Sequence, residues 1–257
     1  MAATRAELAE DTAVYLLPRP TFETVDRGEL VYVAGMRNAT VHRVRTDDLV
    51  RALAWTREES RRRGLRMVEW WLGWSATPPD ARERLLELGL VPDDVPTLTG
   101  MTSSVAPPEI AGVEVRRIET AAEYAETIEI DWEVWQLSEE ERAARRAVEF
   151  DRWEQVDRAG VVHHYAAFVD GVRVGFGRAI DMVGGVGLYG GAVLPEGRGR
   201  GAYRALVRAR WEHAVERGTP LLVVQAGAMS APVLTRLGFE SHGQIDLLVD
   251  HLELEDG

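Results

Sequence analysis

The chain has 257 residues, 46% of them hydrophobic and 28% charged, which is the balance of a soluble globular protein. Its formal net charge of −12 argues against a nucleic-acid binder, because such proteins present a basic face. The absence of cysteine excludes disulfides, thiolate metal sites and cysteine nucleophiles. The sequence shows neither a signal-peptide pattern nor the ~20-residue apolar run of a membrane helix. We expect a cytoplasmic protein with no nucleic-acid or membrane partner.

Strands and helices alternate in the first hundred residues. Leu30-Val31-Tyr32-Val33 and the aromatic-rich residues 66–72 are typical of strands. Two stretches with helical character follow N-cap residues and end at Gly64 and Gly89, because glycine commonly terminates helices. The expected elements are strands at 30–33 and 66–72 and helices at 49–63 and 81–88.

A linker is expected at residues 95–112, which are rich in proline, glycine and serine and show little periodicity. We therefore place a domain boundary near Ala106. The prediction is a first domain at 1–106 and a second domain at 112–257.

The second domain is expected to contain a partly parallel sheet, because strands alternate with helices along it. Asp170-Gly171 marks a tight hairpin turn between two of the strands. The expected elements are an edge strand at 113–118, a mostly helical stretch at 119–158, strands at 165–169, 172–180 and 187–194, a helix at 202–216, a strand at 221–224, a helix at 231–237 and a strand at 245–251.

One local pattern occurs twice, at residues 63–90 and 217–239. In both, an Arg-Gly pair precedes a strand, a Ser-Ala pair opens a short helix, and Leu-Gly followed by a hydrophobic residue closes it. The repetition predicts that the N-terminal part is a shortened copy of the C-terminal fold. The alternative, that such units merely share similar caps, stays open. The first copy has no closely spaced glycines at residues 36–40, taken as the equivalent of the loop described next.

The loop Gly197-Arg198-Gly199-Arg200-Gly201 lies between an expected strand and an expected helix. The first turn of a helix offers amide N–H groups and the positive end of the helix dipole, which favour phosphate. Glycine permits close approach of the backbone, and arginine adds cationic donors. Pro195 interrupts the preceding strand ladder. The loop is either a phosphate site or a solvated turn.

Two common nucleotide motifs do not fit this loop. No Gly-Lys-Ser/Thr follows it, which excludes the Walker pattern. The third glycine of the dinucleotide fingerprint would be Arg204, which disfavours NAD.

The sequence here resembles the GNAT superfamily of N-acetyltransferases. Val193-Leu194-Pro195 and then Arg198-Gly199-Arg200-Gly201-Ala202-Tyr203 are similar to the family signature, a hydrophobic-x-Pro strand end followed by Gln/Arg-x-x-Gly-x-Gly/Ala. The last position is Tyr203, where the family has a small residue. Leu234-Thr235-Arg236-Leu237-Gly238-Phe239 resembles the second motif of the family. The N-terminal part resembles the partial first halves of tandem members.

The resemblance implies an α/β fold, with a GNAT-like mixed, partly parallel sheet flanked by helices and a truncated GNAT-like domain before it. It also implies acetyl-CoA as cosubstrate, held at the acetyl and pantetheine portion by backbone of the cofactor strand and at the pyrophosphate by the loop amides. The strands 187–194 and 221–225 would splay apart to admit it, and Gly190-Gly191 fits a bulge or simply a weak strand. The implied cofactor-binding residues are Ala192, Val193, Arg198, Gly199, Arg200, Gly201, Ala202 and Tyr203.

The implied reaction is direct attack of a neutral amine on the acetyl thioester, with the N–H of Val193 stabilising the oxyanion. The family often supplies a tyrosine as general acid, and Leu234 stands at the matching position. Another group then serves as the acid, the thiolate leaves unaided, or activity is low. Tyr189 and Glu133 are the weak base candidates, although a half-buried strand aromatic and a solvated helix face are the plainer interpretations.

Other candidate side chains carry weaker functional interpretations. His163-His164 begins a strand, but the pattern supplies no third metal ligand, so no metal is expected. Trp132, Trp135 and Trp153 form either an aromatic wall for the acceptor or part of the core.

Three functions remain open. The first is an N-acetyltransferase acting on a primary amine of a small molecule or peptide, and the acidic net charge favours a cationic acceptor. The second is a non-catalytic acyl-CoA-binding regulatory module, favoured by Leu234 and the lack of a clear base. The third is an interaction protein without cofactor. The sequence permits a monomer or a homodimer.

Overall fold

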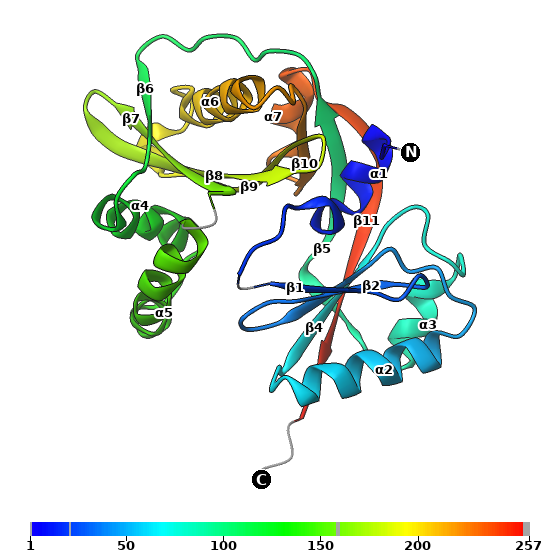
Figure 1. Ribbon diagram of the computed structural model, residues 1–257. Helices are drawn as coiled ribbons and strands as arrows, with labels where there is room; N and C mark the ends of the chain where they lie inside the picture. Colours follow the sequence, from blue (N-terminus) through cyan, green and yellow to red (C-terminus); the bar gives the residue numbers. More distant parts are fainter. Residues whose placement is uncertain (1, 21, 158–159, 254–257) are drawn as a thin grey trace. The chain divides into compact units, whose positions relative to one another are not determined.

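A computed structural model gives the fold of residues 2–20, 22–157 and 160–253, which form two compact units (Figure 1). Unit 1 contains Met1–Met101, Gln225–Val233 and Glu240–Gly257, and unit 2 contains Thr102–Val224 and Leu234–Phe239. The chain first leaves unit 1 a few residues before Ala106, and its C-terminal part returns to unit 1. Within the described residues, no helix combines the length and apolarity that crossing a membrane requires.

Unit 1 has the strand order β1-β2-β3-β4-β11-β5. Its first three strands are antiparallel neighbours, β3 and β4 are parallel, and β11 lies antiparallel to β4. The elements are α1 (Arg5–Glu10), η1 (Thr12–Tyr15), β1 (Glu23–Asp26), β2 (Val31–Ala34), β3 (Ala39–His42), α2 (Leu49–Arg62), β4 (Met67–Leu72), α3 (Ala81–Glu87), β5 (Val91–Ser103) and β11 (Glu240–His251).

The core of unit 1 lies between these strands and α2. The Asp48 side chain begins α2 by accepting the N–H of Arg51 at 3.0 Å. From there, Leu49, Ala52 and Leu53 recur at helical spacing and are buried against the fully buried strand residue Trp70 and its neighbours.

The strand β5 replaces the linker that the sequence predicts from residue 95. Its prolines and Gly100 suggested irregular backbone, but a Cβ at Gly100 would come within 2.9 Å of both the Ala9 carbonyl oxygen and the Trp74 ring. That glycine therefore serves close packing within a strand. The neighbouring strand β11 comes from the other end of the chain, so local sequence could not reveal the pairing. The short elements α1, η1, β1 and β3 were also not expected.

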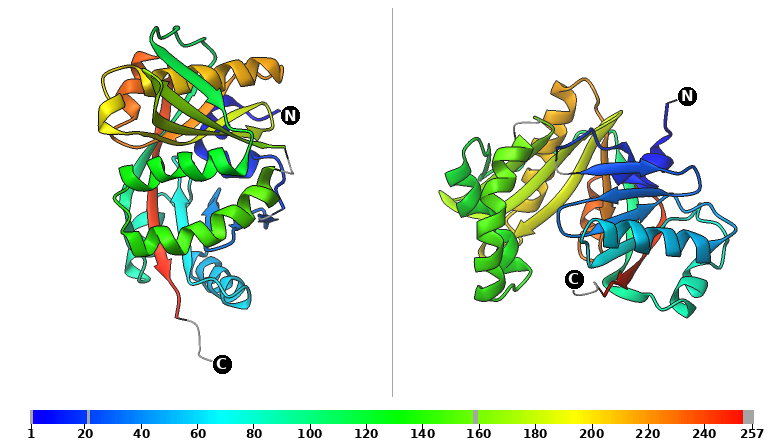
Figure 2. Two further views of the ribbon diagram at one scale, coloured as in Figure 1. Left: turned by 90° about the vertical axis from the view of Figure 1, so that its left-hand side faces the viewer. Right: turned by 60° about the horizontal axis from the view of Figure 1, so that its bottom comes forward.

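Unit 2 has the strand order β10-β9-β8-β7-β6, with β6 to β9 antiparallel and β10 parallel to β9. Helices α4 and α6 cover opposite faces of these strands, and α5 lies beside α4 (Figure 1, Figure 2). The elements are β6 (Val113–Arg117), α4 (Ala121–Val134), α5 (Glu139–Asp157), β7 (Val162–Val169), β8 (Val172–Met182), β9 (Gly185–Val193), η2 (Pro195–Gly197), α6 (Ala202–Glu216), β10 (Leu222–Ala226) and α7 (Ala231–Arg236).

The mostly helical stretch expected at 119–158 consists of two helices, and Arg158 lies outside the described residues. Gln136 has a positive φ of 55°, which ends α4, and Ser138 bonds reciprocally with Glu141 as a cap for α5. The expected hairpin turn between β7 and β8 is confirmed, because Asp170 and Gly171 have φ values of 51° and 79°, as a type I′ turn requires.

The repeated pattern has a physical basis at four helix ends. Gly64, Gly89, Gly218 and Gly238 have φ values of 70°, 99°, 72° and 87°. In each case the next residue donates its N–H to the carbonyl five residues earlier, which is the Schellman arrangement.

The order of elements also repeats, from β2 to β5 in the first copy and from β8 to β11 in the second. This confirms the expected mixed sheet preceded by a shortened copy. It also makes β3 the equivalent of β9, so the equivalent of the glycine loop is residues 43–48. The expectation of residues 36–40 was wrong, because β3 itself was not recognised.

Candidate functional site

The strand β9 carries a bulge at Gly190. Gly191 pairs with Gly177 of β8, but Tyr189 pairs with the next residue, Arg178, so Gly190 is the extra residue of β9. Its φ of 62° suits glycine, and both Gly190 and Gly191 are exposed. The bulge that the glycine pair allowed is therefore present, in the middle of the expected cofactor strand.

The ladder between β8 and β9 turns particular backbone groups of β9 away from β8. Leu194 donates its N–H to the Val174 carbonyl at 2.9 Å, so these opposed residues form a hydrogen-bonded pair. Antiparallel pairs alternate, so Ala192 is bonded to β8, whereas the N–H groups of Gly191 and Val193 face the other way. From the sequence we expected the backbone of Ala192 and Val193 to hold the acetyl and pantetheine portion. The hydrogen-bond ladder agrees with Val193, but Ala192 is bonded to β8, so Gly191 is favoured as the second residue with an outward N–H.

The side of β9 to which these amides turn is the side of β10. The two strands pair at Val186 with Leu222 and at Gly187 with Val223, and no residue of β9 beyond Gly187 is paired with β10. The parallel strands therefore diverge, as the resemblance implied. Backbone of β9 that would otherwise bond a neighbouring strand is available to an extended ligand.

The loop after β9 leads directly into α6. Gly201 is the N-cap with φ of 91°, and no side chain caps the first turn. A Cβ at this position would come within 2.5 Å of the Ile110 side chain, so two constraints select glycine. Gly199 also has positive φ, 73°, but with open space around it. The amides of the first helical turn thus begin beside a loop that lacks bulky side chains at two of its positions.

The two loop arginines make contacts of their own. Arg198 donates from Nε to the Val193 carbonyl at 3.2 Å, and Arg200 pairs with Asp170 at 2.7 Å. Arg198 therefore bonds the Val193 carbonyl, which faces away from β8. The N–H of Val193 is then the polar backbone group of that residue that remains on this side of β9. The half-buried Tyr203 ring packs on Gly191, where a Cβ would come within 3.0 Å of it. Tyr203 thus fits at this signature position because residue 191 of β9 is a glycine.

The tryptophan candidates divide between core and surface. Trp132 and Trp153 are buried with Phe176 and Ala192 in the core between α4 and the sheet, whereas Trp135 is 61% exposed. Trp132 and Trp153 are therefore core residues beneath the cofactor strand β9, and of the three tryptophans Trp135 alone is exposed to solvent.

The catalytic candidates of the sequence lie on two different elements. Tyr189 is half-buried on β9 beside the bulge, and the Glu133 side chain is exposed on α4. Asp131, on the same helix, was missed: it is half-buried, and its Oδ1 has no hydrogen-bond partner among the described residues. Burial raises the pKa of Asp131, against the positive charge of Arg178, which lies opposite Tyr189. Leu234, at the position of the family acid, is fully buried.

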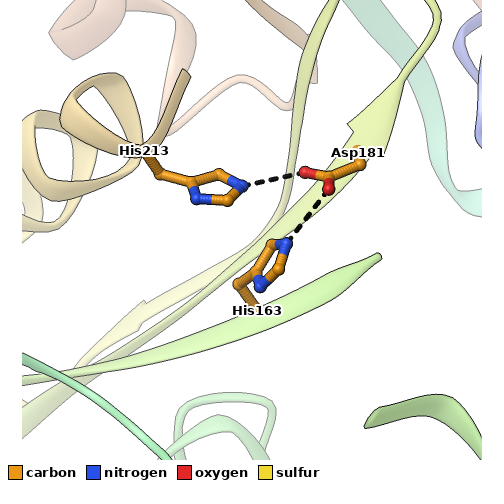
Figure 3. A group of neighbouring side chains, drawn as sticks. All are labelled: His163, Asp181 and His213. Atoms are coloured by element: carbon orange, nitrogen blue, oxygen red, sulfur yellow. Dashed lines mark hydrogen bonds and ion pairs between the residues drawn. The ribbon is translucent and has the colours of Figure 1, made fainter. Parts of the chain in front are cut away.

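A second cluster of ionisable groups is buried in unit 2: His163 of β7, Asp181 of β8 and His213 of α6 (Figure 3). The His163 and His213 Nε2 atoms lie 3.2 and 2.8 Å from the two carboxylate oxygens of Asp181. Arg217 adds a contact from Nε to Asp181 at 3.1 Å. Burial opposes ionisation of Asp181, but the histidine hydrogen bonds and the Arg217 charge outweigh it and hold its pKa well below its usual range.

The same cluster has the ligand set of a metal site, but its protons are arranged differently. Arg117 lies 2.5 Å from His163 Nδ1, and a guanidinium can only donate, so Nδ1 accepts and Nε2 carries the proton. A metal on His163 Nε2 would require the opposite tautomer. Burial also lowers the pKa of His163. The cluster is an ion network that joins strands β6, β7 and β8 to α6.

His164, the neighbour named with His163, points to the other face, as successive strand residues do. Its ring lies 4.7 Å from that of Tyr124 and 5.2 Å from that of Trp153. The sequence paired the two histidines by adjacency, whereas the fold separates them and supplies His163 with partners from distant segments.

Comparison with known proteins places this site in a family. Residues 124–239 match the acetyltransferase (GNAT) family. A comparison with curated proteins gives no match. A GCN5-related N-acetyltransferase from Kribbella flavida superposes with a TM-score of 0.68 at 17% identity, over 100% of this chain and 98% of that one. A tandem GNAT protein from the clavulanic acid biosynthesis pathway has a TM-score of 0.57 at 18% identity, over 93% and 86%.

A functionally unknown conserved protein from Staphylococcus epidermidis has the same fold, with a TM-score of 0.66 at 10% identity over 94% of this chain and 97% of that one. The bulged strand, the diverging neighbour and the loop before α6 define an acyltransferase fold of this type. Residues 124–239 are thus similar to the acetyltransferase (GNAT) family, whose general chemistry is acetyl transfer, and the chain as a whole has the fold of these solved structures.

Proposed function

We propose that unit 2 binds acetyl-CoA along β9 and transfers its acetyl group to a primary amine of a small molecule or peptide. The observation that carries this proposal is the outward-facing backbone of β9 beyond its last pair with β10, followed directly by a glycine-capped helix N-terminus. The first feature suits the amides of pantetheine, and the second suits a pyrophosphate. The two occur in the order in which these groups follow one another in the cofactor.

The loop residues then divide by role. The amides from Arg198 to Tyr203 hold the pyrophosphate at the start of α6, with the exposed side chains of Arg198 and Arg200 beside it. Gly199 and Gly201 keep the backbone approachable, because both adopt positive φ. Ala202 is buried beneath the loop and contributes only backbone.

In the proposed reaction the amine nitrogen attacks the thioester carbonyl carbon. A C–N bond forms while the carbonyl electron pair moves to oxygen, and the N–H of Val193, with that of Gly191, stabilises this oxyanion. The C–S bond then breaks, CoA leaves as its thiolate, and the amine proton passes to a base or to water. Tyr189 and Asp131 are the groups of this chain proposed for that proton.

A non-catalytic acyl-CoA-binding module is the second candidate, and Leu234 favours it. That side chain is fully buried, so it belongs to the core and no hydroxyl is offered at the position of the family acid. The thiol of CoA has a pKa near ~8.5, which makes a thiolate a tolerable leaving group without an acid. The two candidates therefore differ in turnover and share acetyl-CoA binding.

The test is release of free CoA thiol with a panel of primary amines, from polyamines and aminoglycosides to peptides. The chain has no cysteine, so every thiol detected by a thiol reagent belongs to CoA. Gly199→Glu places a carboxylate at the phosphate loop, and Gly218→Glu is its matched control, because the two glycines have φ values of 73° and 72° and open space around them.

We expect turnover with at least one amine in the wild type and in Gly218→Glu, and loss of turnover in Gly199→Glu. Acetyl-CoA binding without turnover on any amine would establish the regulatory module instead. Absence of binding in the folded wild type would overturn both.

A further inference from the structure

The helix α6 buries an arginine on the face that packs against the sheet. Arg210 follows Leu206 by one turn and precedes Ala214 by another, and it is 1% exposed. Buried charged side chains are ordinarily paired with an opposite charge, because removing an ion from water is costly. An arginine in this position therefore requires an explanation.

No carboxylate lies within ion-pair distance of Arg210 in the described part of the chain. Its Nε donates to the Leu206 carbonyl at 2.9 Å, and its Nη1 lies 3.2 Å from the Gly190 carbonyl and 3.3 Å from that of Arg178. Its Nη2 has no partner among the described residues. Burial lowers the pKa of Arg210, yet an arginine stays protonated in proteins. The positive charge is thus buried and not neutralised.

The guanidinium and the bulge of β9 are built around one another. Gly190 is the extra residue of the bulge, and Arg178 is the β8 residue at which the register shifts. Arg210 therefore bonds both strands where their own ladder is interrupted. Gly177 makes room for it, because a Cβ there would lie 3.2 Å from Cζ and 3.4 Å from Nη1.

The contact at Gly190 acts on the next amide through the peptide bond. In a trans peptide the carbonyl of one residue and the N–H of the next point in opposite directions. The Gly190 carbonyl points toward Arg210, so the Gly191 N–H points away from it, in agreement with the ladder alternation. A cation at the oxygen end polarises the peptide and strengthens the N–H as a donor.

We propose that Arg210 is a positioning residue for acetyl transfer, which fixes and polarises the Gly190–Gly191 peptide so that its N–H stabilises the oxyanion. This inference rests on the proposed function of unit 2. A paired arginine would lose most of its field to the partner, whereas this one keeps it for the negative charge that forms on the thioester oxygen and then on the leaving thiolate. Arg210 thus supplies electrostatic stabilisation in a chain that has Leu234 at the position of the family's general acid.

The proposal separates activity from stability. Arg210→Met keeps a long side chain but removes the charge and the donors, and we expect kcat to fall about 10- to 100-fold with little change in the KM for acetyl-CoA. Because an unpaired buried charge is removed, Tm should stay the same or rise. Arg210→Lys should recover part of kcat. Gly177→Ala, which displaces the guanidinium, should lower kcat with Arg210 still present.

Arg208→Met is the matched control on the same helix, because that arginine is 29% exposed and pairs with Glu212. It should leave kcat unchanged. A fall in Tm for Arg210→Met with activity lost in proportion to unfolding would mean a merely structural role, and an unchanged kcat would also overturn the proposal.

A readout in the free protein keeps this inference separate from the proposed function. The amide resonance of Gly191 should move upfield in Arg210→Met and stay in place in Arg208→Met, because its hydrogen becomes less polarised. A stationary Gly191 resonance would refute the polarisation whatever the activity. Turnover that is absent in the wild type would instead refute the proposed function alone.

Discussion

The copy from β2 to β5 in unit 1 and the copy that begins with β8 in unit 2 repeat one order of strands and helices, yet they differ where a cofactor would enter. In unit 2, β9 and β10 separate after Gly187. In unit 1 the corresponding strands β3 and β4 form three consecutive pairs, and Arg45 then bridges to Thr77 beyond their ends. The same arrangement of elements is open in one unit and closed in the other.

The closure of unit 1 comes from its own carboxylates. The Asp11 carboxylate accepts the N–H of Arg43 at 2.9 Å, in the loop that corresponds to the glycine loop of unit 2. The Glu10 carboxylate accepts the N–H of Ser75 after β4, and its side chain fills the place that a Cβ of Gly73 would occupy. The Arg43 amide, in the loop that corresponds to the glycine loop of unit 2, is therefore bonded by Asp11 at the C-cap of α1, and the Ser75 amide after β4 is bonded by Glu10 of α1. We predict one cofactor site per chain.

The largest stability effect should arise in unit 2, at the buried ion network of His163, Asp181 and His213. Asp181→Asn leaves His163, His213 and Arg217 without their shared anion, and we expect a loss of about 3–5 kcal/mol in the free energy of unfolding. Asp170→Asn, which alters an exposed pair with Arg200, should cost less than about 1 kcal/mol. Urea unfolding of both variants measures this. Stabilisation of the wild type by zinc, or its loss with a chelator, would contradict the proton arrangement assigned to the network.

The next effect should arise in unit 1, at the carboxylate that closes it. Burial raises the pKa of Asp11 from 3.8 to about 6. The hydrogen bond from the Arg43 amide lowers this pKa and the nearby Glu10 charge raises it, but burial has the largest effect. Between these values the folded chain holds a proton that the unfolded chain has lost, so stability falls as pH rises from 4 to 6, by up to about 3 kcal/mol. Asp11→Asn should flatten the curve of unfolding midpoint against pH. The exposed Asp47→Asn should not, and a wild-type curve that rises through this window would be inconsistent with the burial argument.

The smallest effect should be equal in the two units. Gly64 ends α2 and Gly218 ends α6, with φ values of 70° and 72° and open space at both positions. Alanine at either site adds only the strain of a left-handed backbone, about 1–2 kcal/mol. Equal losses in urea unfolding would show that the repeated helix ends are energetically equivalent, whereas a several-fold difference would show that the two ends are not equivalent.

Local signals predicted the parts of the fold that depend on neighbouring residues. The helix ends at Gly89 and Gly238, the hairpin at Asp170-Gly171 and the loop before α6 follow from backbone preferences within a few positions. The bulge at Gly190 was one of two interpretations that the glycine pair allowed.

The remaining features depend on contacts between distant segments. The strand β5 resembled a linker because its neighbour β11 comes from the far end of the chain. Asp181 and His213 join His163 only through the strand pairing and the packing of α6. The sequence gives one indication of Arg210, a charge at helical spacing between the apolar residues Leu206 and Ala214, but only the fold shows that it meets a bulge carbonyl. The Glu10 and Asp11 contacts that close unit 1 left none.

The most direct test of the difference between the units is a calorimetric titration of acetyl-CoA into the wild type, Gly199→Glu and Gly218→Glu. We expect one acetyl-CoA per chain for the wild type and for Gly218→Glu, and none for Gly199→Glu, because the added carboxylate blocks the backbone and repels phosphate. Two sites per chain, or binding that survives in Gly199→Glu, would contradict the assignment of the cofactor to the loop of unit 2.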